Sequence, residues 1–465
     1  MSGDAEKLLA SLAGICGEAN VSGEAQALAG YAIDGAIPRA IARPGSAKEI
    51  AEILRLCSAE KLGVVPAGSG TKLRMGPAPS RYDVALVTTR LNQVHSYDPG
   101  DLTLSVGAGA RLNDLETLLE KNRQMLPLAV PFRDRATIGG TVASGIDSPL
   151  RQMHGSTRDF LLGCEFVTGD GTSAKSGGRV VKNVAGYDLH KLFIGPLGTL
   201  GVLTKLNFRT FPLAETSRAF LAAFGGHGEA LGMVGEIRHS ALTLSSLEIL
   251  DPLLASLFAR RTPPTAPGLG DCGAWLPVSG WLVAAGFGGS DAVMARYTND
   301  LERMAGEAGT TGTAILGDDK RPALWGRLRE AIPLLLDVSP ATTMARASVV
   351  PSRMGELIAA ARRASELHEI PAAILARGVG MIYVAFLPET RDAGVLDRLA
   401  LAAGEMVEAA AAAGGFCAIP WCPAELKSRV AIWGKERADI GLIRKVKNVF
   451  DPEGILSPGR FAGGM

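Results

Sequence analysis

The segment Val65-Pro66-Ala67-Gly68-Ser69-Gly70-Thr71 follows an apolar stretch, residues 62–66, that predicts a short buried β-strand. Glycine reaches positive φ angles without steric cost, so successive N–H groups of such a loop can converge on an anion. Two common phosphate-binding patterns do not match. The dinucleotide fingerprint needs glycine where Leu73 stands, and the chain has no Gly-Lys-Ser or Gly-Lys-Thr. We interpret the segment as a phosphate-cradling loop of another kind, with a plain structural turn as the alternative.

Two further glycine-rich segments follow. The second is Ala136-Thr137-Ile138-Gly139-Gly140-Thr141-Val142-Ala143-Ser144-Gly145, whose small residues allow close approach of a flat ligand or of another backbone. The third begins at Val181-Lys182-Asn183-Val184-Ala185-Gly186-Tyr187-Asp188-Leu189 and ends at Gly195-Pro196-Leu197-Gly198-Thr199-Leu200-Gly201-Val202. Glycine amides with a few polar anchors suit a large polyfunctional cofactor. The alternatives are a Gly-rich turn for the second segment and a solvated surface charge for Lys182.

Composition excludes several classes of protein. Glycine supplies 57 of 465 residues, and hydrophobic residues at 47% with charged residues at 20% are typical of a chain that buries a large core. Lysine plus arginine total 48 against 47 acidic residues, so we expect no nucleic-acid partner. We expect no signal peptide, and the sequence has no apolar run of roughly 18 residues that would predict a transmembrane segment. We therefore expect a cytoplasmic location, with the inner membrane reached only through partner proteins.

Metal ligands are not evident in the sequence. The six cysteines include no C-x2-C pair, which argues against a zinc ribbon or a ferredoxin-type cluster. The six histidines show no ligand-like spacing, and none lies beyond His368. We predict no metal site.

The chain divides into four parts. Residues 1–40 predict an N-terminal helical segment, 41–215 a first domain with the glycine segments, 216–434 a second domain, and 435–465 a C-terminal segment returning to the first domain.

Local patterns predict the individual elements. Ser46 followed by Glu49 predicts the start of a helix over 47–61. In the second domain, apolar stretches over 281–287 and 381–387 predict strands. Ala-rich stretches over 356–367 and 394–413 predict helices.

In this order, the three glycine segments resemble the PCMH-type FAD-binding domain of the vanillyl-alcohol-oxidase family of flavoproteins. The linking segment His154–Gly163 and the closing segment Phe450–Arg460 are also similar to that family. The resemblance implies an α+β protein: a two-subdomain PCMH-type FAD-binding domain, then an α+β cap domain with an antiparallel sheet and helices.

The resemblance also implies how FAD is held. The first segment would bind the pyrophosphate, the second would form a loop that runs along the ribityl chain and flavin ring, and residues 198–202 would hold the adenosine half. Gly68-Ser69-Gly70 offers no histidine or cysteine for a covalent link, so non-covalent FAD is expected. A cation near the ring would raise its potential. Arg158, Lys182, Arg377 and Arg460 are the candidates, with a structural ion pair as the alternative for each. The predicted cofactor-binding residues are Pro66, Ala67, Gly68, Ser69, Gly70, Thr71, Thr137, Ile138, Gly139, Gly140, Ser144, Gly145, Arg158, Lys182, Gly198, Thr199, Gly201 and Val202.

Within that family, residues 182–188 and 195–202 look most like the FAD-binding E-type subunits of bacterial glycolate oxidases. Catalytic D-type subunits and D-lactate dehydrogenases usually have Ser-Glu where this chain has Pro196-Leu197. They also carry a His-x-Gly-Asp-Gly-Asn-x-His-like motif in the C-terminal third, which is absent here. Oxidising a hydroxy acid needs a base and a clamp for the carboxylate. We identify no catalytic residue.

The resemblance therefore implies an FAD-binding subunit that takes part in electron transfer. Its partners would be a catalytic D-type flavoprotein subunit and an iron–sulfur F-type subunit, in a complex acting on a small 2-hydroxy acid. Two alternatives remain open. One is a self-sufficient FAD-linked D-2-hydroxy-acid dehydrogenase of the D-lactate type, with an unrecognised base within residues 216–434. The other is a non-catalytic interaction subunit that has lost FAD.

Overall fold

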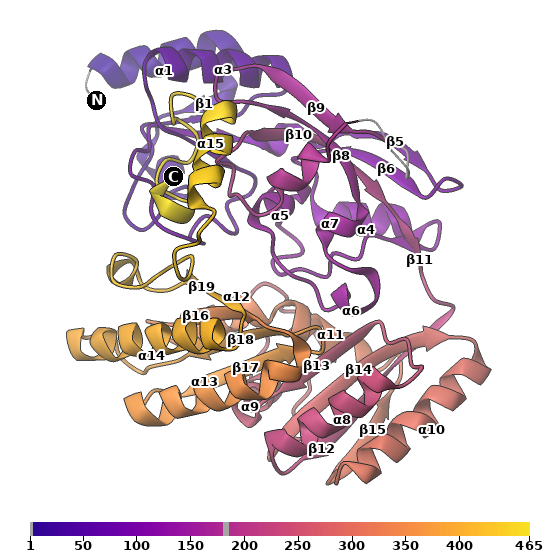
Figure 1. Cartoon of the computed structure of the whole chain (residues 1–465). Coiled ribbons are helices and arrows are strands. Elements are labelled where there is room, and N and C mark those ends of the chain that lie inside the picture. The colour runs from indigo at the N-terminus through magenta and orange to yellow at the C-terminus, as the bar shows by residue number, and fades with distance from the viewer. Residues whose placement is uncertain (1–2, 180–185) are drawn as a thin grey trace.

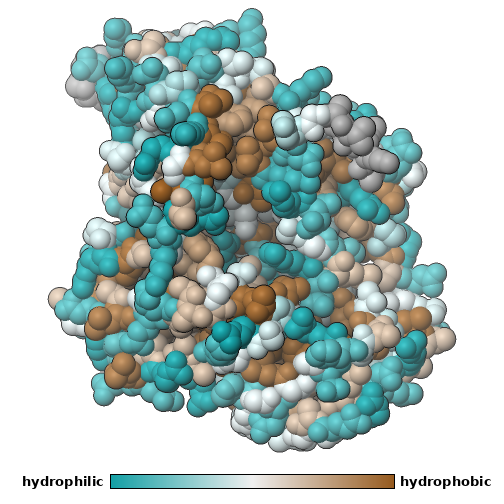
Figure 2. Space-filling view, viewed as in Figure 1, coloured by the Kyte–Doolittle hydropathy of each residue, from teal (hydrophilic) through white to brown (hydrophobic). Residues whose placement is uncertain are grey.

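The computed structural model describes residues 3–179 and 186–465. Two α+β parts lie one above the other in Figure 1, and the yellow C-terminal helix α15 (Ile440–Phe450) lies against the upper, N-terminal part. Hydrophilic residues cover most of the face in Figure 2. Hydrophobic residues gather over α15, which exposes Leu442 and Val449.

The first sheet of the upper part has the strand order β1-β2-β4-β3. Strands β2, β4 and β3 are parallel, and β1 pairs with β2 in antiparallel orientation. Buried apolar side chains of α1 and α3 pack against this sheet. The elements are α1 (Gly3–Cys16), β1 (Val21–Ser22), α2 (Ala25–Ala29), β2 (Ala40–Ala42), α3 (Ala47–Ala59), β3 (Val64–Ala67) and β4 (Val84–Val87).

Helix α3 confirms the start predicted from the sequence. The Ser46 hydroxyl accepts a hydrogen bond from the Glu49 N–H, which caps the first turn. Its buried residues include Ile50, Ile53 and Leu54, so an apolar face decides which side packs on the sheet.

The second sheet of the upper part is antiparallel, with the order β5-β6-β10-β8-β9. Short helices and a two-stranded ribbon of β7 and β11 surround it. The elements are β5 (Val94–Asp98), β6 (Thr103–Gly107), α4 (Leu112–Glu120), β7 (Gln124–Met125), α5 (Ile138–Ser144), α6 (Arg151–His154), α7 (Thr157–Phe160), β8 (Leu161–Val167), β9 (Ser173–Gly177), η3 (Leu189–Phe193), β10 (Val202–Arg209) and β11 (Phe211–Pro212).

The second glycine segment, predicted to be a loop, is largely the helix α5. The Thr137 hydroxyl accepts a hydrogen bond from the Gly140 N–H, and Gly145 ends the helix with a φ of 57°. Each glycine costs a helix about 1 kcal/mol relative to alanine. Close packing requires Gly139 nonetheless, because a Cβ there would lie 2.7 Å from the Ala108 Cβ.

The lower part contains an eight-stranded antiparallel sheet with the order β15-β12-β14-β13-β17-β18-β16-β19. Its strands are β12 (Thr216–Phe224), β13 (Ser246–Leu250), β14 (Trp281–Gly289), β15 (Gly312–Leu316), β16 (Thr343–Ser348), β17 (Ala372–Arg377), β18 (Met381–Phe386) and β19 (Phe416–Trp421). Its helices are α8 (His227–His239), α9 (Pro252–Arg260), α10 (Asp291–Glu307), α11 (Arg321–Arg329), α12 (Ala331–Val338), α13 (Met354–His368) and α14 (Ala393–Ala412). The strands predicted at 281–287 and 381–387 and the helices predicted at 356–367 and 394–413 are confirmed.

Successive side chains of a strand point to opposite faces of the sheet, so the lower part has one apolar cluster on each face of its sheet. In β12, Phe220 and Phe224 face the cluster formed with α8, α10, α13 and α14, the outer helices of Figure 1. Leu221, from the opposite face of the same strand, belongs to a cluster that includes α9, α11, α12 and residues of the upper part. The inner face of this sheet therefore packs towards the glycine segments.

Candidate functional site

A cavity lies where the three glycine segments meet. Thirteen of the predicted cofactor-binding residues line it: Pro66, Ala67, Gly68, Ser69, Gly70, Thr71, Thr137, Gly139, Gly140, Ser144, Gly198, Gly201 and Val202.

The other five predicted residues are not part of the described cavity wall. Gly145 lines a neighbouring cavity. Ile138 and Thr199 are buried in the packing around the site, and Arg158 is exposed on α7. Lys182 lies outside the described residues.

The cavity wall also contains residues that we did not predict. Thr88 follows β4, the parallel neighbour of β3, so both strands end at the same edge as the first glycine segment. That adjacency of strand ends could have revealed it. Nothing local in the sequence marks the others. Besides Thr88, the wall includes Lys72, Leu73, Ala108, Ala143, Leu197 and Leu203, together with Arg460, which was predicted only as a cation near the ring.

Glycine lets the three segments touch one another. A Cβ on Gly68 would lie 2.0 Å from Thr137 Oγ1, so only glycine fits where the first segment meets the second. Gly198 has a φ of 76°, and a Cβ on it would lie 3.1 Å from the Pro66 ring, where the third segment meets the first. The cavity wall is therefore largely backbone and small side chains.

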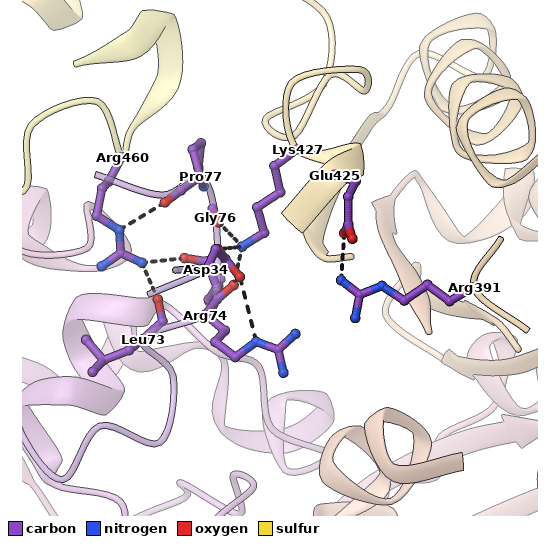
Figure 3. A network of polar contacts seen from close by, with 10 residues as sticks. Asp34, Leu73, Arg74, Gly76, Pro77, Arg391, Glu425, Lys427 and Arg460 are labelled. Carbon is purple, nitrogen blue, oxygen red and sulfur yellow. Dashed lines mark hydrogen bonds and ion pairs between the residues drawn. The ribbon is translucent and has the colours of Figure 1, made fainter. Parts of the chain in front are cut away.

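The C-terminal segment, residues 435–465, is hydrogen-bonded to the chain around the cavity. Arg460 donates hydrogen bonds to the carbonyls of Leu73, Met75 and Pro77, just after the first glycine segment (Figure 3). The Ser457 hydroxyl donates to the Leu197 carbonyl at 3.0 Å, in the third segment. Residues some 260 to 390 positions away in sequence thus hold two of the three segments.

A buried ion pair joins the two parts of the molecule beside this segment. Lys427 Nζ lies 2.6 Å from Asp34 Oδ2 and donates to the Arg74 carbonyl at 2.7 Å and to the Gly76 carbonyl (Figure 3). The two side chains are only 6% and 3% exposed. Burial lowers the pKa of Lys427, and Asp34 opposes that shift. The contact fixes the lower part against the chain that leaves the first glycine segment.

A second buried charge cluster lies on the inner face of the large sheet. Arg377 Nε, at the end of β17, is 3.4 Å from Asp147 Oδ2 and 3.8 Å from Glu248 Oε2. The ring centroid of Tyr383 lies 5.6 Å from the Arg377 guanidinium. Burial raises the pKa of Glu248 to about 8, although Arg377 opposes the shift. Arg377 therefore forms an ion pair with Asp147 between the two parts, while its Nε and Nη1 make no hydrogen bond to the described residues.

The turn between β17 and β18 has the glycine spacing of the histidine motif without its histidines. Residues 376–383 read Ala-Arg-Gly-Val-Gly-Met-Ile-Tyr, so Gly378 and Gly380 keep the Gly-x-Gly spacing of that motif. If these glycines are matched to the motif, Ala376 and Tyr383 fall where it has histidine. Within the described ranges, no three His, Cys, Asp or Glu side chains are grouped so that they could hold a metal ion. In the same ranges no helix combines the length and apolar character needed to cross a bilayer.

Comparison with known proteins identifies the family. Residues 38–177 match a family described as an FAD binding domain, and residues 213–461 match FAD linked oxidases, C-terminal domain. The glycolate oxidase subunit GlcD of Bacillus subtilis (strain 168) is 27% identical over 91% of this chain and 89% of its own length. The glycolate oxidase subunit GlcE of Escherichia coli (strain K12) is 39% identical over 34% of this chain and 45% of its own length.

Solved structures show the same fold. The p-cresol methylhydroxylase structure with substrate bound superimposes with a TM-score of 0.78 at 18% identity, covering 99% of this chain and 97% of that one. The large antiparallel sheet with its helices is thus the cap domain that follows a PCMH-type FAD-binding domain. This chain belongs to the FAD-linked oxidase family of FAD-dependent oxidoreductases, whose members similar to it include subunits of glycolate oxidase.

Proposed function

We propose that this chain is the FAD-binding, E-type subunit of a complex that oxidises a small 2-hydroxy acid, and that it transfers electrons through non-covalently bound FAD. Its partners in this proposal are a catalytic D-type flavoprotein subunit and an iron–sulfur F-type subunit. The observation that carries the proposal is Arg377, which is engaged by Asp147 and Glu248 on the face of the cap sheet that packs towards the flavin-binding domain.

The cavity fits FAD in chemistry. Its wall is backbone with a few polar groups, as in cofactor pockets. Gly68, Ser69, Gly70 and Thr71 would give amides and hydroxyls to the diphosphate. Gly139, Gly140 and Ser144 would face the ribityl chain and ring, and residues 198–202 would hold the adenosine half. Bound FAD supplies a two-electron acceptor.

The charges around Arg377 argue against hydroxy-acid oxidation by this chain alone. A substrate carboxylate needs a cation that it can reach, and the substrate hydroxyl needs a base. Arg377 is 6% exposed, and its Nε lies within 4.0 Å of two carboxyl side chains. Its Nε and Nη1 make no hydrogen bond to the described residues, so its burial, rather than occupied donors, argues against its use as a clamp for a substrate carboxylate. Ala376 and Tyr383 at the motif's histidine positions offer neither a metal ligand nor an imidazole base.

The sequence similarities divide between two roles. The 39% identity to the E-type subunit over 160 residues supports the proposed role. The 27% identity to the D-type subunit over 433 residues favours a second candidate, a self-sufficient FAD-linked D-2-hydroxy-acid dehydrogenase.

Anaerobic reduction of the purified chain tests the proposal. We expect a yellow protein whose FAD is released intact by denaturation and stays oxidised when glycolate or D-lactate is added. Adding the catalytic subunit and substrate should then reduce it. Rapid bleaching of the chain alone would instead support the second candidate. A colourless chain without affinity for FAD would support a non-catalytic interaction subunit.

Co-purification from the native host tests the partners. We expect a tagged chain to retain a second flavoprotein and an iron–sulfur protein at fixed stoichiometry. A chain that elutes alone at native expression levels, with FAD bound, would contradict the assignment as a subunit.

A further inference from the structure

Lys72, the residue after the first glycine segment, lines the cavity and has a buried ammonium group. The residue is 9% exposed. Its Nζ is 3.4 Å from Thr71 Oγ1, to which it donates, and 5.8 Å from the centroid of the Phe132 ring. Within residues 3–179 and 186–465, no carboxylate oxygen lies within 4.0 Å of it. The ammonium thus has one long hydrogen bond and one ring face as its contacts.

The cap domain determines where that ring lies. Glu330, between α11 and α12, accepts hydrogen bonds from the Phe132 N–H at 2.8 Å and from the Arg133 N–H at 3.3 Å. Phe132 has a φ of 64°, a strained value for a bulky residue, which these bonds stabilise. Lys72 therefore sits at the side of the cavity that faces the cap.

Glu330 does not neutralise Lys72 directly. Its carboxylate accepts the Thr265 hydroxyl at 2.6 Å and lies 3.4 Å from Arg329 Nε, in addition to the two backbone donors. Burial lowers the pKa of Lys72 to about 8, and the more distant Glu330 carboxylate only partly opposes this.

A buried ammonium without a counter-charge costs free energy of folding. The other cation in the described cavity wall, Arg460, already donates to three carbonyls. Lys72 therefore differs from Arg460 in lacking strong partners of its own at the cavity. An anion in the cavity would supply the missing counter-charge.

We propose that Lys72 is a positioning residue whose ammonium balances the negative charge of reduced FAD and so raises the reduction potential of this subunit. The inference rests on the proposed binding of FAD in this cavity. FAD takes up two electrons and one proton to become the anionic FADH⁻, with the electrons coming from a 2-hydroxy acid through the catalytic subunit, or from dithionite in the test. A cation beside the cofactor stabilises that added charge. The location of Lys72 at the cap side favours the ring over the diphosphate, for which the amides of residues 68–71 are available.

The affinity of the full chain for FAD and the reduction potential of the bound FAD provide the test. Lys72→Met should weaken binding of reduced FAD at least tenfold more than binding of oxidised FAD. The midpoint potential, measured by dithionite titration against a reference dye, should fall by at least about 30 mV for a two-electron couple. Lys72→Arg keeps the charge and should restore most of the potential. Lys48→Met removes the same charge from an exposed position on α3, where the side chain is 87% exposed, and should change neither quantity.

Other outcomes overturn the inference. Equal weakening of both oxidation states with an unchanged potential would assign Lys72 to the diphosphate. Unchanged binding and potential would make the residue structural. Failure of the unsubstituted chain to bind FAD would refute both the proposed function and this inference. If the unsubstituted chain binds FAD but Lys72→Met leaves the reduction potential of the bound FAD unchanged, only this inference is refuted. Folding of Lys72→Met is checked on the apo-protein, which should melt at a higher temperature than wild type at pH 7.

Discussion

Lys447, on the inner face of α15, donates a hydrogen bond from its Nζ to the main-chain carbonyl of Thr199, 2.7 Å away. The same ammonium pairs with Asp451 and donates to the Leu456 carbonyl at 3.0 Å. Asp451 in turn accepts the N–H groups of Ile455 and Leu456. The C-terminal helix thus holds the third glycine segment through one buried lysine.

Lys447→Met should release that segment. It leaves the Asp451 carboxylate buried without its cation, which costs about 3–5 kcal/mol. Denaturant unfolding should show that loss, and FAD titration should show weaker binding. Lys445→Met, on the exposed side of the same helix, is the matched control and should change both by little. Equal stability of the two variants would contradict this role.

Gly68→Ala should disrupt the contact between the first and second glycine segments. The new Cβ would lie 2.0 Å from Thr137 Oγ1, so one of the segments must move and FAD affinity should fall by at least tenfold. Thr137→Ala alone should cost about 1 kcal/mol through loss of the helix cap. The double variant should be less destabilised than the sum of the single ones, because the clashing hydroxyl is gone. Gly14→Ala, with no atom within 4 Å, is the control. Additive effects would show that the two residues do not clash.

The Lys427–Asp34 pair should contribute to the docking of the cap domain. Lys427→Met leaves the buried Asp34 only its ion pair with the exposed Arg74, whose Nε is 3.8 Å away, and we expect the free energy of unfolding to fall by up to about 3–5 kcal/mol. Adding Asp34→Asn removes the poorly paired charge and should recover part of that loss. Arg391→Met removes an exposed ion pair with Glu425, also drawn in Figure 3, and should cost under about 1 kcal/mol. A Lys427→Met variant as stable as Arg391→Met would contradict the prediction.

Glu248 should make stability depend on pH. Its pKa is raised by burial from 4.5 to about 8 in the folded protein, so between these values the folded state holds a proton that the unfolded chain has lost. Stability should therefore fall as the pH rises from about 4.5 to 8. Glu248→Gln, which keeps a neutral side chain of the same shape, should gain stability relative to wild type as the pH rises from 5 to 8. Thermal melting of both proteins across that range checks this. Glu52→Gln, on the solvent side of α3, should show no such gain, and parallel curves for Glu248→Gln would contradict the assignment.

Local patterns predicted much of the fold. Ser46 and Glu49 lie three residues apart, so their capping contact needs only the first turn of a helix. The strands at 281–287 and 381–387 and the Ala-rich helices are also set by neighbouring residues. The second glycine segment was predicted wrongly as a loop because glycine disfavours helices. Packing against Ala108 and the Thr137 cap override that preference.

The candidate site was predicted in part for the same reason. Thirteen of its residues lie in glycine segments whose order resembles that of a known family. These residues could be recognised in the sequence because the backbone geometry of the segments requires glycine and small side chains. Arg377 and Arg460 were recognised as cations, but their partners lie far away along the chain. Lys72 was not singled out, because a lysine after a glycine loop is most often solvated.

The sequence by itself determined the three glycine segments, their order and the secondary structure that carries them, because backbone freedom, capping and apolar periodicity act over a few residues. Only the tertiary structure decided which charges are neutralised: Arg377 by Asp147, Lys447 by Asp451, and Lys72 by no carboxylate within the described residues. The physical reason is that the energy of a charge depends on burial and on partners brought together from distant parts of the chain.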